Sequence, residues 1–224
     1  MARVARRFPV SRINLRRCAG RKPRVNGVSP DKNHLRIDQL AETLDAEARK
    51  SYPPVHLWDP ANVGEIDIRI AADGTWYHEG DPILRPALVR LFSTVLRKDD
   101  DGRHYLVTPA ERLAIEVDVA PLYVSEMYRE GEGDDQTLFF RTHTGDVAPL
   151  DEAHPLRVPV DPGTGEPTPL VLVRDRLEGL LARSVFYDLV DIAEEREIDG
   201  VAVQGVMSAG RFHVIGRSDG RPLD

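Results

Sequence analysis

The residues best suited to chemistry are charged and aromatic side chains that lie close together between positions 67 and 118. They are Asp67, Arg69, Trp76, His78, Glu79, Arg85, Glu116 and Asp118. A carboxylate beside a histidine moves the imidazole pKa across neutrality, so the two groups can act together as general acid and base. One hypothesis is therefore a small hydrolase or isomerase that uses His78 with Asp67 or Asp118. The alternative is that these residues, Glu116 apart, bind a ligand or partner and catalyse no reaction.

The same residues also have a purely structural explanation. Charged residues that alternate with isoleucine or valine are typical of any half-exposed strand. The ion pairs on such a face each contribute less than about 1 kcal/mol. A tryptophan just after a hairpin turn often covers the edge of a core with its N–H toward water. The spacing alone therefore favours a solvated sheet face over a catalytic centre.

Standard catalytic and cofactor motifs are missing from the chain. Gly163-Thr164-Gly165 lacks the lysine and the strand-to-helix setting of a phosphate-binding loop, and no Gly-x-Ser-x-Gly segment provides a nucleophile elbow. The seven histidines show no spacing that places two on one helical face, so neither a metal nor a cofactor is expected. These absences favour a non-enzymatic binding or regulatory protein, whose partner is an unidentified small molecule or protein.

Charge is distributed unevenly along the 224 residues. Residues 1–24 contain nine Lys or Arg and no acid, whereas the remainder contains 21 basic and 37 acidic residues, a balance of −16. An acidic body repels phosphate groups, so the protein as a whole does not fit a nucleic-acid-binding protein. No apolar run approaches eighteen residues, which excludes a transmembrane helix and membrane partners. The single Cys18 fits a reducing, cytoplasmic location.

A helix-and-strand pattern occurs twice in the sequence. An apolar helical stripe at 84–92 is followed by a strand at 102–107, and a similar stripe at 182–190 is followed by a strand at 210–215. We therefore predict an α+β protein of two small lobes of mixed or antiparallel sheet with one main helix each, related by a weak internal repeat. The expected division is a basic tail at 1–30, a first lobe at 31–122 and a second lobe at 123–224. The seam between the lobes is the first place to look for a site.

Local patterns predict the elements of the first lobe. Residues 38–50 have the spacing of a short amphipathic helix, and 65–70 alternate as a strand that turns at Asp73-Gly74 into a strand at 75–78. Asp81-Pro82 has the composition of a helix start, and apolar pairs from 83 to 96 predict the main helix. Thr108 and Glu111 have capping-box spacing for one helical turn, and alternation predicts a strand at 115–119.

In the second lobe, strands are expected at 122–128, 137–142 and 170–173. Six prolines between Pro149 and Pro169 exclude a helix there and restrict any strand to a sheet edge. This proline-rich segment, with the acidic surface, supports a third hypothesis, a scaffold that docks other proteins. Asp175 and Glu178 can cap the start of a helix that runs to about residue 195, and 201–207 with 212–215 predict an antiparallel pair.

Several segments resemble a known bacterial family. They are Gly64-Glu65-Ile66-Asp67-Ile68-Arg69-Ile70, Asp73-Gly74-Thr75-Trp76 and His78-Glu79-Gly80-Asp81-Pro82-Ile83, followed by parts of 105–111 and by 115–121. The family is catalogued as domain of unknown function 1285, and the resemblance extends from about Pro54 onwards. It implies a two-lobed α+β protein with a repeated structural motif. A role in signal transduction has been suggested for the family, and the resemblance implies no particular reaction.

Overall fold

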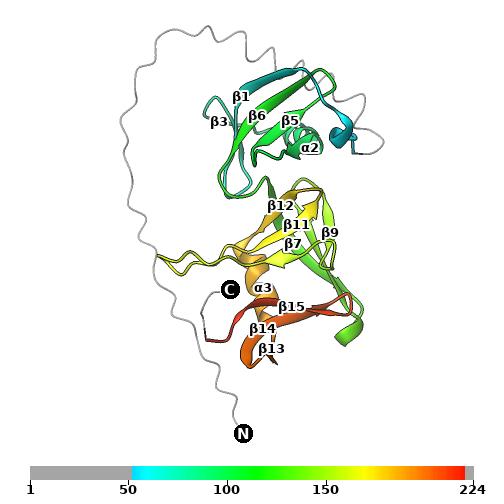
Figure 1. The fold of residues 1–224 in the computed structure, drawn as a ribbon, viewed down its shortest axis with the longest axis vertical. Coiled ribbons are helices and arrows are strands. Elements are labelled where there is room, and N and C mark those ends of the chain that lie inside the picture. Colours follow the sequence, from blue (N-terminus) through cyan, green and yellow to red (C-terminus); the bar gives the residue numbers. More distant parts are fainter. Residues whose placement is uncertain (1–51, 220–224) are drawn as a thin grey trace.

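The computed structural model describes residues 52–219. The basic segment 1–24, the expected tail 1–30 and the predicted helix 38–50 lie outside these residues. The described chain forms two lobes of mixed sheet, each with one α-helix, as the sequence predicts (Figure 1).

The first lobe is a six-stranded sheet in the order β3-β2-β1-β6-β5-β4. Its strands are β1 (Asn62–Ile70), β2 (Trp76–His78), β3 (Asp81–Pro82), β4 (Leu96–Lys98), β5 (His104–Val107) and β6 (Glu111–Val117). The helix α2 (Pro86–Thr94) covers one face, and the 3-10 turn η1 (Val55–Leu57) precedes the sheet. The central pair β1 and β6 is parallel, and the other neighbours are antiparallel.

The second lobe contains a six-stranded sheet in the order β10-β11-β12-β7-β8-β9. Its strands are β7 (Leu122–Glu130), β8 (Thr137–Thr142), β9 (Val147–Pro149), β10 (Leu156–Arg157), β11 (Leu170–Arg174) and β12 (Leu177–Leu181), with the 3-10 turn η2 (Gly133–Asp135) after β7. The helix α3 (Arg183–Asp191) leads into a three-stranded sheet of β13 (Glu194–Ile198), β14 (Val201–Ser208) and β15 (Arg211–Arg217). Both short strands of the proline-rich region, β9 and β10, lie at sheet edges, as the prolines predict.

The internal repeat lies in the strand order of the two sheets. Each sheet places its first and last strands, β1 with β6 and β7 with β12, as a parallel pair at its centre. The repeated unit expected from the helical stripes is therefore wrong. Helix α2 lies inside the first six-strand unit, α3 follows the second, and β15 belongs to the three-stranded sheet. Helical stripes share the 3.6-residue period whatever their position in a fold, which is why they suggested a false equivalence.

Several predicted boundaries are also corrected. The main helix of the first lobe begins at Pro86, and Asp81–Pro82 forms β3 beside β2. Proline does occupy the start of this helix, as expected, but the proline concerned is Pro86 and not Pro82. The predicted helical turn at Thr108 is a tight turn between β5 and β6, in which the Thr108 hydroxyl accepts hydrogen bonds from the N–H groups of Ala110 and Glu111 at 3.2 and 3.1 Å.

In the second lobe, the helix predicted to start at Asp175 or Glu178 begins only at Arg183, because residues 177–181 form β12. The chain turns at Asp175, whose φ is 46°, and this left-handed geometry ends β11. Strand β13 was not predicted, since its sequence Glu-Glu-Arg-Glu-Ile has only one apolar residue. The predicted strands at 137–142 and 201–207 are confirmed as β8 and β14.

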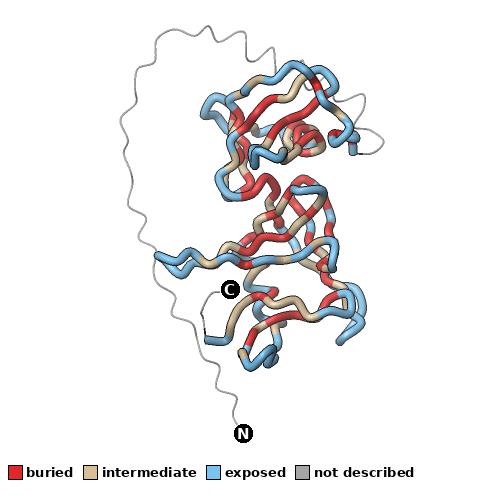
Figure 2. Tube along the Cα trace, in the orientation of Figure 1, coloured by how far each residue is buried: buried red, intermediate tan, exposed pale blue. Residues whose placement is uncertain are grey.

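One apolar cluster runs through both lobes. In the first lobe it contains Ile68, Trp76 and Phe92, and in the second it contains Leu122 and Phe140, all almost fully buried. Figure 2 shows the buried residues following the inner faces of both sheets and reaching the junction between the lobes. Because each buried side chain of this size contributes about 1.5–3 kcal/mol, packing across the junction helps to hold the lobes together.

Candidate functional site

A turn of the second lobe holds the two lobes together. Arg174, at the end of β11, donates through Nε to Asp146 Oδ1 at 2.8 Å and through Nη2 to the carbonyl of Ser93 in the first lobe. Ser93 lies in the last turn of α2, where helix carbonyls lack partners within the helix. The Arg174 guanidinium therefore completes the C-terminal end of α2 with a positive charge, which the helix dipole favours.

The carboxylate of Asp146 is the buried partner of this arginine. It also accepts hydrogen bonds from the hydroxyls of Thr142 at 3.0 Å, Thr144 at 2.9 Å and Tyr52 at 2.9 Å. Burial alone would raise the pKa of Asp146, but attraction to Arg174 and the hydrogen bonds outweigh it, so the pKa lies below its usual value. Burial and the Asp146 charge raise the pKa of Tyr52 to about 12.

The hairpin turn at Gly74 is a second contact between the lobes. A Cβ atom placed on Gly74 would lie 2.6 Å from Cβ of Tyr123 and 3.2 Å from the ring of His143, both in the second lobe. Gly74 also has a φ of 81°, the left-handed geometry that the predicted turn requires. Glycine at this position therefore permits both the turn and the close approach of the lobes.

Residues from both lobes line a cavity of about 660 Å³. Its lining residues are Val55, His56, Arg97, Lys98, Asp99, Asp100, Asp101, Arg112, Asp175 and Arg176. A smaller hollow of about 380 Å³ shares Lys98, Asp175 and Arg176 and extends along the seam toward Arg157 and Glu178. This cavity thus lies at the predicted seam, and eight of its ten lining residues are charged.

The wall from the first lobe is held rigidly by Asp99. Its carboxylate accepts from Arg97 Nε at 2.5 Å and Nη2 at 3.1 Å, and from Arg112 Nη1 at 2.7 Å. Arg97 also donates to the carbonyls of Val55 and Trp58, which fixes the segment before β1. Because the charges of Arg97, Asp99 and Arg112 are matched by fixed hydrogen bonds, this part of the wall keeps its shape without a ligand.

The wall from the second lobe is made by the residues that follow Arg174. Arg176 Nη1 lies 2.5 Å from Asp100 Oδ1 and crosses the seam, and both side chains are exposed. Lys98 and Asp175 form no hydrogen bond or ion pair with another described side chain, although both line the two hollows. The cavity therefore offers one cation and one carboxylate that no other described side chain contacts through a hydrogen bond or ion pair.

The smaller hollow has its own fixed charges. Arg157 donates through Nε and Nη2 to both oxygens of Glu178, at 2.5 and 2.8 Å, and this pairing lowers the pKa of Glu178. Nearby, burial lowers the pKa of His104, and the positive charge of Lys98 lowers it further. His104 is therefore chiefly neutral at pH 7 and can donate or accept a hydrogen bond there.

The residues predicted from the sequence do not line this cavity. Strand pairing places Trp76 beside Ile70 and His78 beside Ile68, so both face the buried side of the sheet. Asp67 and Arg69 project from the opposite face, where Arg69 Nη1 contacts Asp118 Oδ2 at 2.7 Å. The predicted pairing of His78 with Asp67 or Asp118 as acid and base is therefore not assembled, because the pleat sends the side chains to opposite faces.

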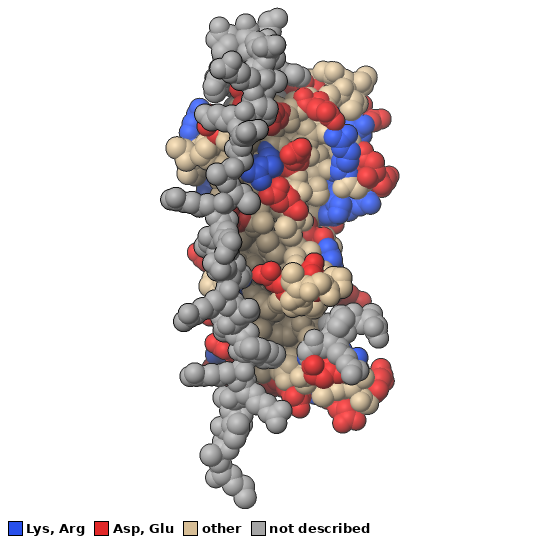
Figure 3. Space-filling model, turned by 90° about the vertical axis from the view of Figure 1, so that its left-hand side faces the viewer, with Lys and Arg blue, Asp and Glu red and all other residues tan. Residues whose placement is uncertain are grey.

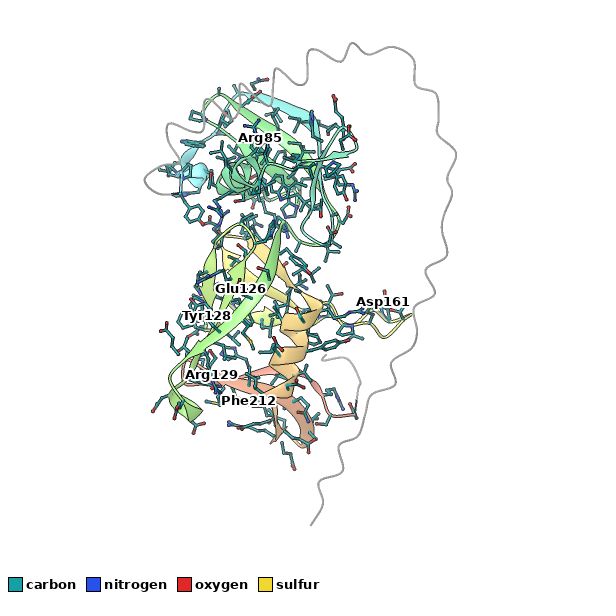
Figure 4. The ribbon with its side chains drawn as sticks, turned by 180° about the vertical axis from the view of Figure 1, so that it is seen from behind. Arg85, Glu126, Tyr128, Arg129, Asp161 and Phe212 are labelled. Atoms are coloured by element: carbon teal, nitrogen blue, oxygen red, sulfur yellow. The ribbon has the colours of Figure 1, made fainter. Side chains whose placement is uncertain are left out.

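The other predicted residues lie at the margins of the same lobe. Glu79 is exposed at a turn with a φ of 52°. Arg85 is exposed at the position just before α2, and Figure 4 shows it on the first lobe, well separated from the labelled residues of the second. Arg69 and Asp118, with Asp67 beside them, remain a predicted binding group on the outer sheet face, separate from the seam.

Sequence reasoning missed the seam residues. The segment 175–178 predicts only a helix start, and the acidic run 99–101 suggests no binding role by itself. The available signal was that each segment has a cation beside its acids, Lys98 before 99–101 and Arg176 within 175–178, but nothing in either segment shows that the two face each other. Among residues 52–219, no group of three His, Cys, Asp or Glu could hold a metal ion. Neither α-helix of these residues is long and apolar enough to cross a membrane.

Comparison with known proteins identifies both halves of the chain. Residues 53–120 match the family model described as the N-terminal domain of DUF1285, a domain of unknown function, and residues 121–215 match the C-terminal domain of DUF1285. The two matches meet at the junction between the two sheets. No curated protein matches the chain.

Two solved structures are similar to this chain. A DUF1285 family protein from Silicibacter pomeroyi DSS-3 is 44% identical, with a TM-score of 0.72, and the match covers 80% of this chain and 96% of that one. A DUF1285 family protein from Shewanella baltica OS155 is 22% identical, with a TM-score of 0.44, over 55% of this chain and 90% of that one.

Proposed function

This chain belongs to the DUF1285 family, and we propose that it is a non-enzymatic binding protein whose cavity between the lobes takes a small polar molecule. The observation that carries this proposal is the 660 Å³ cavity at the seam. Ligand sites commonly have volumes of about 300–1,000 Å³ and occur at domain interfaces. The cavity meets both criteria, and its walls are pre-formed by the bonds of Asp99 and Arg174.

The charges of the lining favour a ligand with both signs of charge. Four lining residues are cationic and four are anionic, and Lys98 and Asp175 are the pair that other side chains leave available. A carboxylate on the ligand would bind Lys98, and an ammonium group would bind Asp175, so amino acids and related zwitterions fit best. An apolar ligand would leave these charges desolvated and unpaired, which costs several kcal/mol.

Binding at the seam also supports a role in signal transduction. The cavity is lined by both lobes, so a ligand that contacts Lys98 in the first and Asp175 in the second favours one relative position of the lobes. The exposed Asp100–Arg176 pair crosses the same seam and is weak enough to exchange for ligand contacts. A downstream partner would detect the change in the relative position of the two lobes.

A thermal-shift and calorimetry screen of the intact chain against amino acids, organic acids and nucleotides tests the proposal. The double variant Lys98→Ala/Asp175→Asn should bind a zwitterionic hit at least about tenfold more weakly, a loss of about 1.4 kcal/mol. The variant Arg129→Ala is the matched control, because Arg129 is an exposed cation on β7, away from the seam (Figure 4). A panel without any hit, equal affinity in both variants, or turnover of a hit would contradict the proposal.

A second candidate function is docking of another protein through the proline-rich segment. Residues 159–167 form a hairpin that projects from the body, with a bridge between Val160 and Pro167 and with Asp161 at its tip (Figures 1 and 4). Asp161 Oδ1 accepts from the N–H groups of Gly163 and Thr164 at 2.9 and 2.7 Å, which fixes the tip. A pre-ordered projection loses little entropy on binding, a property that suits recognition.

Replacing residues 159–167 with a short Gly-Ser turn tests this second function. The variant should lose capture of a protein partner that the intact chain retains, while its thermal unfolding midpoint stays unchanged, since these residues contribute nothing to the core. Capture that persists in the variant would show that the segment is only a connection between β10 and β11.

A further inference from the structure

The second half of α3 and β13 expose several large apolar side chains among charged ones. Four large hydrophobic side chains of residues 187–198 are exposed to solvent, namely Tyr187, Val190, Ile192 and Ile198, between 38% and 55% each. We call residues 187–199 the apolar–acidic face. A group of exposed apolar side chains rimmed by charge is characteristic of an interaction surface.

Strand β13 gives this face an open sheet edge. It pairs with β14 on one side and is the terminal strand of its sheet, and all five of its residues are exposed. An edge strand presents unpaired N–H and C=O groups that can bind another extended segment. The backbone of β13 can therefore add main-chain hydrogen bonds to any apolar contacts made with Tyr187 or Ile198.

The charge of the face restricts what can bind there. Its acids are Asp188, Asp191, Glu194, Glu195, Glu197 and Asp199, and Arg196 is its only cation. In Figure 3 the charged side chains visible on the lower, second lobe are mostly Asp and Glu. Two copies of β13 placed edge to edge would set glutamates against glutamates, so the face disfavours self-pairing and favours a basic segment.

The chain itself contains a segment of complementary composition. Residues 1–24 carry nine Lys or Arg and no acid. Apolar side chains are interspersed among these cations, at Val4, Phe8, Val10, Ile13 and Leu15. The segment therefore matches the face in both respects, with positive charge for its acids and apolar groups for its exposed hydrophobic residues.

The connection to the described chain is long enough for the two to meet. The 27 residues from 25 to 51 can span up to about 90 Å when extended. The two lobes are stacked along the long axis (Figure 1), and at about 30 Å for each compact lobe they extend about 60 Å together. A segment tethered in this way also has an effective concentration in the millimolar range, so modest affinity is enough for docking.

We propose that residues 1–24 dock on the apolar–acidic face of the same chain, alongside β13. In this arrangement the arginines of the segment lie against the carboxylates of α3 and β13, and its apolar residues cover Tyr187 and Ile198. Because much of the attraction is between exposed charges, docking weakens as salt increases. The basic segment then also shields the acidic edge of the three-stranded sheet.

Hydrogen exchange on the intact chain, compared with a chain that lacks residues 1–24, tests this arrangement. Amides of 194–198 should exchange at least about tenfold more slowly in the intact chain at low salt, because docking must open before they exchange. The difference should disappear in 1 M salt, where the Debye length is about 3 Å. Adding a synthetic peptide of residues 1–24 to the shortened chain should restore the protection.

Charge reversal supplies the matched variants. Glu195→Lys/Glu197→Lys should remove the protection, and Arg12→Glu/Arg16→Glu in the same chain should restore it. The control Glu130→Lys/Glu132→Lys reverses two exposed acids at the end of β7 and should change nothing. Equal exchange in the intact and shortened chains, or protection that survives the reversal, overturns the proposal. Protection that rises with protein concentration overturns docking within one chain, since it indicates binding between copies.

Discussion

The outer face of the first sheet and the seam between the lobes both carry an arginine–aspartate pair, but the two pairs differ in setting. On the sheet face, Arg69 and Asp118 are 39% and 37% exposed. At the seam, Arg174 and Asp146 are 16% and 5% exposed. The first pair joins neighbouring strands of one sheet, whereas the second joins β11, the turn after β8 and the end of α2. The comparison shows that burial and long-range assembly, more than residue type, separate a structural junction from a solvated surface.

The largest expected effect comes from removing the buried carboxylate of the seam. Asp146→Ala leaves the Arg174 guanidinium and three hydroxyl groups without their common acceptor, so it should lower the free energy of unfolding by about 3–5 kcal/mol. Urea unfolding measures this change. The matched variant on the sheet face, Asp118→Ala, should cost less than about 1 kcal/mol. Similar losses of unfolding free energy in the two variants would show that the seam pair and the sheet-face pair do not differ in their contribution to stability.

The next effect concerns the close approach at the hairpin turn. Gly74→Ala introduces a methyl group against Tyr123 in a left-handed backbone conformation, and we expect a loss of about 3 kcal/mol. Gly102→Ala is the control, because Gly102 has a similar φ of 79° but no atom within 4 Å of the added carbon. That variant should lose about 1 kcal/mol, the backbone cost alone. The difference between the two variants in thermal unfolding measures the contact between lobes, and equal losses would show that it contributes nothing.

A smaller effect should appear at alkaline pH through Tyr52. Its folded-state pKa of about 12 lies above the unfolded value of about 10. The tyrosine therefore contributes stability that is fully present below pH 10 and is lost as pH rises toward 12. Half of the side chain faces solvent, so the contribution is at most about 1 kcal/mol. Thermal unfolding between pH 9 and 12 should show a steeper decline for the intact chain than for Tyr52→Phe, and parallel curves would contradict the assignment.

The same linkage acts in the opposite direction for Asp146. Its folded-state pKa is depressed, so its contribution is present above the unfolded pKa of about 3.9 and is lost as pH falls through the folded value. The stability of Asp146→Ala should therefore depend less on pH below about 4 than that of the intact chain.

The smallest effects are expected for the exposed pairs. Double-mutant cycles for Arg69 with Asp118 and for Arg176 with Asp100 should both give less than about 1 kcal/mol in unfolding. Only the second pair lines the cavity, so only Arg176→Ala should change the affinity for a ligand found there. If the affinity for a ligand instead depends on Arg69, the binding site lies on the outer sheet face and not at the seam.

Local sequence patterns predicted the structural elements that depend mainly on neighbouring residues. Alternation marked β1, and the Asp73-Gly74 turn followed from the tolerance of glycine for positive φ. The prolines indicated that β9 and β10 lie at sheet edges. The two lobes and their helices were also predicted, because hydrophobic periodicity survives in almost any tertiary setting.

The rest depended on contacts that no local pattern records. A helix start is predicted where β12 lies, because Asp175 and Glu178 resemble helix caps. In the structure the chain turns at Asp175, and β12 pairs with β7. The cavity was missed for a similar reason, since its walls come from positions about 75 residues apart, such as Asp100 and Arg176. The sequence could indicate that a site lies at the seam between the lobes, but it could not show which side chains meet there.

The shared strand order of the two sheets has a consequence for the synthesis of the chain. In each six-stranded sheet the central strand, β1 or β7, is made first, and its parallel neighbour, β6 or β12, is made last. Neither sheet can close before its final strand leaves the ribosome, so the buried faces of Ile68 and Ile70 stay uncovered until about residue 117 has emerged. Such non-local pairing slows folding and prolongs the exposure of apolar strands to aggregation. A first half cut off before β6 keeps α2 but lacks the strand that completes the centre of its sheet, whereas a second half cut off before β12 lacks α3 as well.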